Sequence, residues 1–314
     1  MGEEPEPDYV HFSSNSSIKC CQPVHINNEY FLLIGNHVGV CSLFSLQSNT
    51  IIATVHEDKE ERQIVGVGQI ENGDLFIHIR SYEVLRIRAK KSIRNILSFD
   101  VVNKWSTSYC GFCAAISCTF GLLIPSDMAQ LKLIKGDSEQ IIDLCSNELK
   151  NCGTLTCFAT ILSNFILSGF ENGTLAVTDI ESSDLIDKVE AFRKPILASA
   201  VHSNYIVVSS VASPLKTFHL DDNKLIELNS IPFPQTARGC GSLCFSPCGK
   251  LVASGYWDGS VRVHSLRSGK IRACITLHSN LINHLCWCNV ETTRILFVAS
   301  DDCKLSIWNL HKDR

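Results

Sequence analysis

Short segments in which apolar and polar residues alternate recur along the chain, and each follows a turn rich in Gly, Asp or Asn. The clearest examples are "SGFENGTLAVTDI", "ASGYWDGSVRVHSL" and "ASDDCKLSIWNL". Alternation with a period of two is typical of β-strands, because successive side chains point to opposite faces of a sheet. The pattern therefore predicts an all-β protein built from repeated strand units.

The repeats are regularly spaced. One marker residue in each turn gives intervals of 44, 44, 46, 40, 46 and 44 residues, with the markers at Gly39, Glu83, Asp127, Gly173, Ser213, Gly259 and Cys303. Apolar residues two and four positions after most markers are predicted to point inward, at Cys41 and Leu43, Leu85 and Ile87, Leu175 and Val177, Val261 and Val263, and Leu305 and Ile307. Seven units of this length predict a closed ring of seven four-stranded blades, a β-propeller.

The two ends of the chain suggest how the ring closes. Only four residues follow "LSIWNL", too few for a fourth strand in the last blade. We expect "DYVHF", residues 8–12, to supply that strand, which would pair edges that are otherwise exposed. The predicted organisation is an acidic tail over residues 1–7 and a single propeller over residues 8–314.

The last repeat resembles the WD40 family most fully, and the resemblance extends over nearly the whole chain. In "LHSNLINHLCW", His278 is followed by apolar Ile282 and Leu285, and Asp302 precedes Trp308 by six residues. The resemblance implies that His278, Asp302 and Trp308 join a hydrogen-bond network that fixes the turn to the strand. His278 is therefore interpreted as a structural histidine and not as a ligand or base.

The pair Trp257-Asp258 is not the dipeptide that names this family. Asp258 matches the turn Asp of the network, so the naming position falls at His264-Ser265. In WD40 blades the residue before the turn Asp tends to lie on the top face near the central channel, where a large aromatic is typical of an interface. We predict that Trp257 and Tyr256 bind a protein there; the alternative is packing against a neighbouring loop. The corresponding positions are predicted at His37, Ser81, Glu171 and Asp301.

Charge does not favour nucleic acid as the partner. The net charge is −4 and the pI is near 6.3, so the chain as a whole does not attract phosphate backbones. One stretch, "RSYEVLRIRAKKSIR", is basic, and Arg86, Arg88 and Lys90 alternate on one face of a strand expected at an edge. These cations either prevent edge-to-edge pairing or bind an acidic partner or a phosphate backbone.

Sixteen cysteines without a signal peptide point to a reducing compartment, in which thiols stay free and pack as small apolar groups. "CGFC" at Cys110 and Cys113 has redox or zinc spacing but lacks a second pair, and Cys240, Cys244 and Cys248 lie on a strand and turn. Strand packing is the favoured interpretation; metal or redox chemistry is the alternative. The charge-free stretch 105–126 is interpreted as strands and turns, not as a membrane helix.

No motif for catalysis, a cofactor or a metal is present in the sequence, so a noncatalytic protein without a small-molecule substrate is expected. "ILSGFENGTLAV", "LVASGYWDGSVRV" and "ITLHSNLINHLCW" resemble the guanine nucleotide-binding protein subunit beta-like protein 1 family, which includes the yeast ASTRA-associated protein 1. The resemblance implies an adaptor in the nucleus and cytoplasm that acts with the Triple-T co-chaperone on phosphatidylinositol 3-kinase-related kinases, and with chromatin-linked ASTRA assemblies.

Other WD40 roles remain open at this point. A G-protein γ subunit is not expected, because only seven residues precede the first strand and no long helix can form there. A substrate receptor of a cullin ubiquitin ligase would use the same top face. A chromatin- or RNA-binding propeller would depend on Arg86, Arg88 and Lys90.

Overall fold

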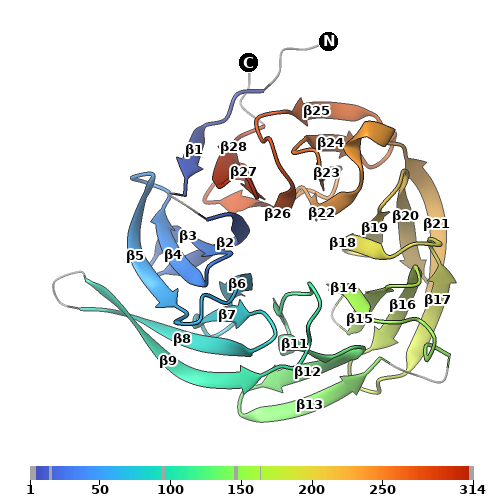
Figure 1. The fold of residues 1–314 in the computed structure, drawn as a ribbon. Coiled ribbons are helices and arrows are strands. Elements are labelled where there is room, and N and C mark those ends of the chain that lie inside the picture. Colours follow the sequence, from blue (N-terminus) through green and yellow to red (C-terminus); the bar gives the residue numbers. More distant parts are fainter. Residues whose placement is uncertain (1–4, 14–15, 93–95, 145–147, 163, 311–314) are drawn as a thin grey trace.

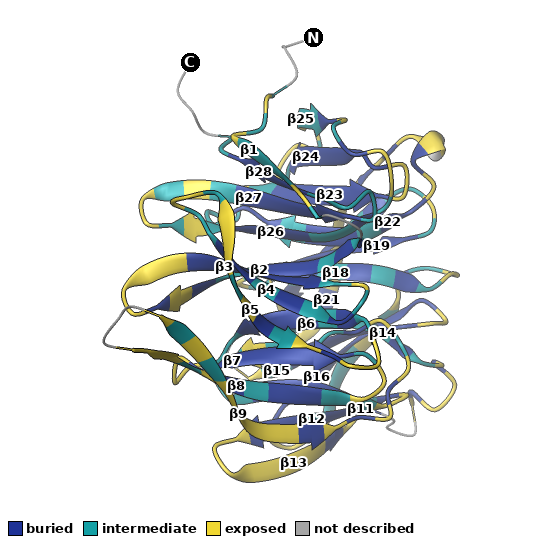
Figure 2. Ribbon diagram, turned by 60° about the vertical axis from the view of Figure 1, so that its left-hand side comes forward, coloured by how far each residue is buried: buried dark blue, intermediate teal, exposed yellow. Residues whose placement is uncertain are grey.

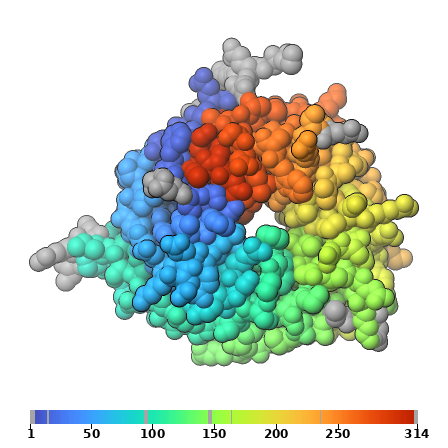
Figure 3. Space-filling model, viewed as in Figure 1, coloured from blue at the N-terminus to red at the C-terminus, as the bar shows by residue number. Residues whose placement is uncertain are grey.

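Seven four-stranded antiparallel sheets stand around a central axis (Figure 1). The computed structural model describes residues 5–13, 16–92, 96–144, 148–162 and 164–310; part of the acidic tail, residues 1–4, lies outside this range. The predicted seven-bladed β-propeller is confirmed. In the space-filling view, a channel opens at the centre of the ring (Figure 3).

The first four blades are formed by strands that follow one another in sequence. Blade 1 consists of β2 (Ile18–Ile26), β3 (Glu29–Asn36), β4 (Val40–Ser45) and β5 (Thr50–Glu57). Blade 2 consists of β6 (Ile64–Gln69), β7 (Leu75–Ile79), β8 (Glu83–Lys91) and β9 (Leu97–Ser106). Blade 3 consists of β10 (Ile116–Cys118), β11 (Gly121–Asp127), β12 (Gln130–Lys135) and β13 (Ser138–Asp143). Blade 4 consists of β14 (Leu155–Ile161), β15 (Phe165–Phe170), β16 (Thr174–Asp179) and β17 (Leu185–Glu190).

The remaining blades complete the ring. Blade 5 consists of β18 (Ile196–His202), β19 (Tyr205–Ser210), β20 (Leu215–Asp221) and β21 (Lys224–Ile231). A short 3₁₀ helix, η1 (Gln235–Ala237), lies in the connection to blade 6. Blade 6 consists of β22 (Cys240–Phe245), β23 (Leu251–Tyr256), β24 (Val261–Ser265) and β25 (Ile271–Ile275). Blade 7 combines β26 (Ile282–Val290), β27 (Thr293–Ser300) and β28 (Lys304–Trp308) with β1 (Tyr9–Phe12).

The N-terminal strand closes the ring as predicted. β1 pairs antiparallel with β28, with Tyr9 opposite Ile307 and Phe12 opposite Lys304. The last blade thus takes its outermost strand from the start of the chain, and the first and last repeats are joined by backbone hydrogen bonds.

The hydrophobic core lies between neighbouring blades. Leu305 and Ile307 of blade 7, for example, are buried against Ile18 and Leu32 of blade 1. The outer strands β9 and β13 are the more exposed parts of blades 2 and 3, as their yellow colour in Figure 2 shows. The second strand of each blade is therefore buried on both faces over most of its length, and the outer strands β9 and β13 lie half in solvent.

In blade 2 the predicted register is wrong by one residue. Leu85 and Ile87 pack toward blade 1, whereas the inward residues of blade 7 pack toward the next blade around the ring. Val84 takes the equivalent place in blade 2 and packs toward blade 3, in a cluster with Leu122. The turn "IRSYE" contains neither Gly nor Asp, so the marker assigned to Glu83 lies one residue too late.

The stretch 105–126 consists of the end of β9, the short β10 and most of β11, as the interpretation as strands and turns predicts. Across the described ranges of the chain, no helix is long and apolar enough to cross a membrane.

Candidate functional site

One end of the ring carries all the positions at which the sequence predicts a binding site. In a four-stranded antiparallel blade, the turn between the second and third strands and the connection to the next blade lie at the same end of the sheet. We call this end the top face. Turns of different blades are matched through the last backbone pair before each turn. These pairs are Gly35–Cys41, His78–Val84, Gly169–Leu175, Gly255–Val261 and Ala299–Leu305.

Trp257 lies in the top-face turn of blade 6, where it packs on a neighbouring loop and stays partly exposed. Its side chain packs over the connection from blade 5, since a Cβ atom added to Gly239 would lie 2.9 Å from the indole ring and one added to Gly241 would lie 3.3 Å from Nε1. Its backbone N–H donates to the Gly239 carbonyl at 3.2 Å. Trp257 nevertheless remains 41% exposed. The loop therefore holds the indole in place while part of it stays open to a partner.

Tyr256 is not available to a partner, which corrects the prediction. It is fully buried, and its ring packs against that of Phe233 at 5.0 Å between centroids. The Arg262 guanidinium lies 4.5 Å from the ring centroid, and the Ser254 hydroxyl donates to the Tyr256 hydroxyl at 2.9 Å. Tyr256 is the last residue of β23, and the pleat of the strand turns its side chain into the core.

The other predicted top-face residues differ in how exposed they are and in whether they bond to neighbouring residues. His37 and Glu171 are exposed. Glu171 accepts a hydrogen bond from the Thr154 N–H at 3.3 Å, which ties its turn to the connection from blade 3. Asp301 forms an ion pair with Lys19 and accepts from the Asn283 amide at 2.7 Å. Burial opposes ionisation of Asp301, but these bonds hold its pKa below the ordinary value. Asp301 thus joins blades 7 and 1.

Sequence reasoning missed a group of aromatic and methionine side chains on the same face. Because of the register error in blade 2, the true counterpart of Trp257 is Arg80 and not Ser81. The Arg80 guanidinium lies 4.2 Å from the ring centroid of Phe112, which is 74% exposed in the connection to blade 3. Met128, in the turn of blade 3, is also exposed. No periodic pattern marks such loop residues.

A second cation–aromatic contact lies beside the first. The Arg62 guanidinium stacks 3.4 Å above the ring of Tyr82 and also pairs with Asp58 at 2.8 Å. Asp58 has a lowered pKa because Arg62 donates to it. The segment 56–62 is therefore an ordered connection whose charges hold an aromatic side chain at the top face.

Blade 7 contains a buried hydrogen-bond network that links its turn to its strand. Asp302 contacts His278 Nδ1 at 3.1 Å, and His278 Nε2 contacts the Ser306 hydroxyl at 2.7 Å. Trp308 Nε1 donates to the same hydroxyl at 2.6 Å. Burial lowers the pKa of His278, while the Asp302 hydrogen bond opposes that change. Neutral His278 therefore donates from Nδ1 and accepts at Nε2, a structural arrangement with every polar group satisfied.

Asp258, at the equivalent position of blade 6, takes part in a smaller network. Its carboxylate accepts from the backbone N–H of Ser260 at 2.9 Å, and Arg262 donates to the Ser260 hydroxyl at 2.8 Å. His264 replaces the tryptophan of blade 7, and burial lowers the pKa of His264 to about 4. The turn of blade 6 is thus held by its own short-range bonds.

The predicted basic patch has acidic partners within the chain. Arg86 and Arg88 donate to Asp74 at 2.7 and 3.0 Å, and Lys90 pairs with Asp100 at 2.7 Å. Burial raises the pKa of Asp74, but the hydrogen bonds from both arginines outweigh this and lower it. The prediction of an edge strand is wrong, because β9 pairs along β8 and is itself the outer strand. Edge protection therefore does not explain these cations.

The cysteines are distributed over many blades. Cys110 is exposed, whereas burial raises the pKa of Cys113, of Cys240 to about 12, and of Cys244. Cys248 lies in the first turn of blade 6, close to the Ser246 hydroxyl at 3.4 Å. Among the residues that the structure describes, no three His, Cys, Asp or Glu side chains are arranged to hold a metal ion.

Comparison with known proteins gives consistent results. A family model for the WD40 domain of anaphase-promoting complex subunit 4 matches residues 204–290. Guanine nucleotide-binding protein subunit beta-like protein 1 of Mus musculus is 20% identical over 340 residues, which cover 98% of this chain and 97% of that protein.

Two solved structures share the fold. The β-propeller domain of Cps50 (Swd1) from Myceliophteria thermophila has a TM-score of 0.75 at 11% identity, covering 96% of this chain and all of that one. The computationally designed Ika8 protein has a TM-score of 0.68 at 16% identity, covering 98% of this chain and 100% of that one. Together with the blade 7 network, these matches agree with the resemblance seen in the sequence: the chain is a seven-bladed β-propeller that is similar over residues 204–290 to a WD40 domain and over nearly its whole length to guanine nucleotide-binding protein subunit beta-like protein 1.

Proposed function

We propose that the protein is a noncatalytic adaptor that binds partner proteins on its top face. The observation that carries the proposal is the presence of exposed large apolar side chains on that face, Tyr82, Phe112 and Met128 in blades 2 and 3 and their connection and Trp257 across the ring in blade 6. Aromatic and methionine side chains held by neighbouring loops and arginines are typical anchors of protein interfaces. WD40 propellers generally serve as scaffolds, in keeping with this assignment.

The finer proposal concerns the assembly in which the adaptor acts. Similarity to guanine nucleotide-binding protein subunit beta-like protein 1 extends over both chains almost completely. It supports a role with the Triple-T co-chaperone in the maturation of phosphatidylinositol 3-kinase-related kinases, and with ASTRA-type chromatin assemblies, in the nucleus and cytoplasm. The ion pairs of Arg86, Arg88 and Lys90 weigh against the nucleic-acid-binding alternative, since Asp74 and Asp100 already engage these three cations within blade 2.

Affinity purification from cells, followed by quantitative mass spectrometry, tests both levels of the proposal. The variants are Trp257→Ala and, as a matched control, Tyr205→Ala, since Tyr205 is a 40% exposed aromatic at the start of β19. We expect wild type and the control to recover co-chaperone subunits and large kinases, and Trp257→Ala to lose them while it remains folded and unfolds cooperatively.

Other outcomes would overturn one level or both. Recovery of cullin components or histones that depends on Trp257 would retain the top-face site and refute the proposed assembly. Equal recovery by all three proteins would refute Trp257 as an anchor. Equal loss in both variants would show that the effect does not belong to the top face.

A further inference from the structure

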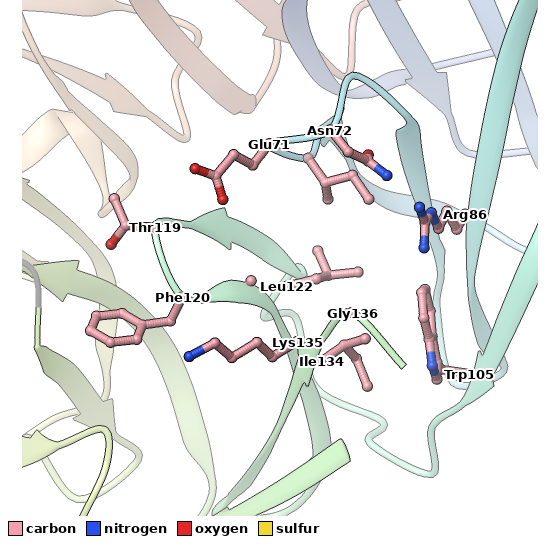
Figure 4. A pocket seen from close by; sticks show the side chains of 12 residues that line it. Glu71, Asn72, Arg86, Trp105, Thr119, Phe120, Leu122, Ile134, Lys135 and Gly136 are labelled. Atoms are coloured by element: carbon pink, nitrogen blue, oxygen red, sulfur yellow. The ribbon is translucent and has the colours of Figure 1, made fainter. Parts of the chain in front are cut away.

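A groove opens between blades 2 and 3 at the end of the ring opposite the top face. Its volume is about 430 Å³, within the range of sites that hold a small ligand or a few side chains. The turns β6–β7, β10–β11 and β12–β13 surround it (Figure 4). β10, the innermost strand of blade 3, has only three residues and ends directly at the β10–β11 turn that lines the groove.

The walls of the groove are apolar and fixed. Trp105, Leu122 and Ile134 line it and are at the same time members of one buried cluster between the two blades. Gly121 has a φ of +139°, and a Cβ atom there would lie 2.0 Å from the carbonyl oxygen of Ile134. Only glycine fits this close approach, which brings the β10–β11 turn directly against the end of β12 at the floor of the groove. The groove is therefore preformed.

Two cations flank these apolar walls. The Nε of Arg86 is held by Asp74 at 2.7 Å, which places the guanidinium on the wall above Trp105. Lys135 extends along the opposite wall, and within the described part of the chain no ion pair neutralises it. Glu71 is the acidic side chain among the lining residues, and Asp74 is shared between Arg86 and Arg88, so the groove and this arginine pair together keep an excess of positive charge in a protein whose net charge is −4.

We propose that this groove binds a short extended segment of a partner protein in which an acidic side chain lies close to a large apolar one. The apolar side chain packs on Trp105, Leu122 and Ile134, and the carboxylate lies between Lys135 and Arg86. Burying apolar surface provides the affinity, and the two cations set the orientation and select the acidic side chain. Because the groove is at the opposite end from Trp257, the ring can hold two proteins at once.

The test uses fluorescein-labelled decapeptides of Gly and Ser that contain Asp or Glu next to, or one or two residues before, Leu or Phe. Fluorescence anisotropy with the full chain measures their affinity. The variant is Lys135→Glu, and the matched control is Lys270→Glu, because Lys270 is an exposed lysine in the corresponding turn of blade 6. Twin peptides with Lys in place of the acid report charge selectivity.

We expect at least one acidic peptide to bind with a Kd of tens of micromolar, to bind Lys135→Glu at least tenfold more weakly, and to bind Lys270→Glu and Trp257→Ala as wild type. The Lys-containing twin should prefer Lys135→Glu over wild type. Absence of binding by every acidic peptide, or equal weakening by both lysine variants, would overturn the proposal. Loss of binding in Trp257→Ala would assign the peptide to the top face and would also refute the groove.

Discussion

Blades 6 and 7 have top-face turns of the same length with equivalent strand pairing, but the two turns are held by different means. In blade 7, Asp302 connects the turn to His278 from the preceding connection and, through Ser306, to Trp308. In blade 6, Asp258 bonds only to nearby Ser260 in its own turn. The first turn is fixed by a long-range polar network, and the second by local bonds and by the packing of an aromatic ring.

The difference follows from substitutions at the network positions. Thr236, Arg262 and His264 of blade 6 occupy the places of His278, Ser306 and Trp308 in blade 7. In the absence of the network, the residue before the turn Asp helps to hold the turn of blade 6. That residue is Trp257, which packs on the connection from blade 5. We infer that the absence of the network from one blade leaves room for an interface aromatic, whereas a complete network uses its turn for structure.

The largest expected effect comes from breaking the network of blade 7. His278→Ala leaves Asp302 and the Ser306 hydroxyl buried without their partner, so we expect a loss of about 2–4 kcal/mol of unfolding free energy. With an unfolding entropy of roughly 2.1 cal/mol/K per residue, the melting temperature should fall by about 3–6 °C. Differential scanning calorimetry measures it. A fall below 1 °C would show that the network does not stabilise the blade.

The buried histidine of blade 6 should make stability depend on pH. Burial lowers the pKa of His264 to about 4 in the folded protein, from an ordinary value of 6.5. Between these values the unfolded chain binds more protons, so stability falls as the pH drops from 6.5 toward 4, by up to about 3 kcal/mol from this residue. His264→Leu should lose less unfolding free energy than wild type between pH 7 and pH 4.5 in urea titrations. The same pH dependence in both proteins would contradict the assignment.

The ring was predictable from the sequence because repeat spacing and period-two alternation follow directly from repeated β-strand units. The register failed in blade 2, where "IRSYE" has no Gly or Asp to locate the turn, and this hid Arg80 as the counterpart of Trp257. The network of blade 7 was visible because its residue types and spacings are specific.

The binding surface was less predictable. Phe112 lies in an irregular connection between blades, and nothing in its local sequence indicates that Arg80 holds it at the top face. Tyr256 is adjacent to Trp257 in sequence, but the end of a pleated strand sends the two side chains in opposite directions, one into the core and one outward. Exposure at a strand end depends on where the strand stops, which pattern alone places only approximately.

A smaller effect should come from disturbing the support of Trp257. In Gly239→Ala, a φ of +110° and a Cβ contact of 2.9 Å with the indole both oppose the new side chain. Gly73→Ala is the matched control, because Gly73 has a φ of +88° and no atom within 4 Å of its Cβ position. We expect Gly239→Ala to lose about 1 kcal/mol more unfolding free energy than Gly73→Ala and to change the tryptophan emission. Equal losses with unchanged emission would show that Gly239 does not support the ring.

The smallest expected effect is that of the turn aspartate in blade 6. Asp258→Ala removes hydrogen bonds to Ser260 at an exposed site, where water replaces the lost acceptor, so about 0.5 kcal/mol of unfolding free energy should be lost. Asp302→Ala removes the acceptor of His278 and of the backbone N–H groups of Ser279 and Lys304, and should cost about 2 kcal/mol. Urea titration of both variants measures the difference directly. If the two substitutions cost the same, the turns of blades 6 and 7 have equal polar support. The exposure of Trp257 would then not follow from the loss of the network in blade 6.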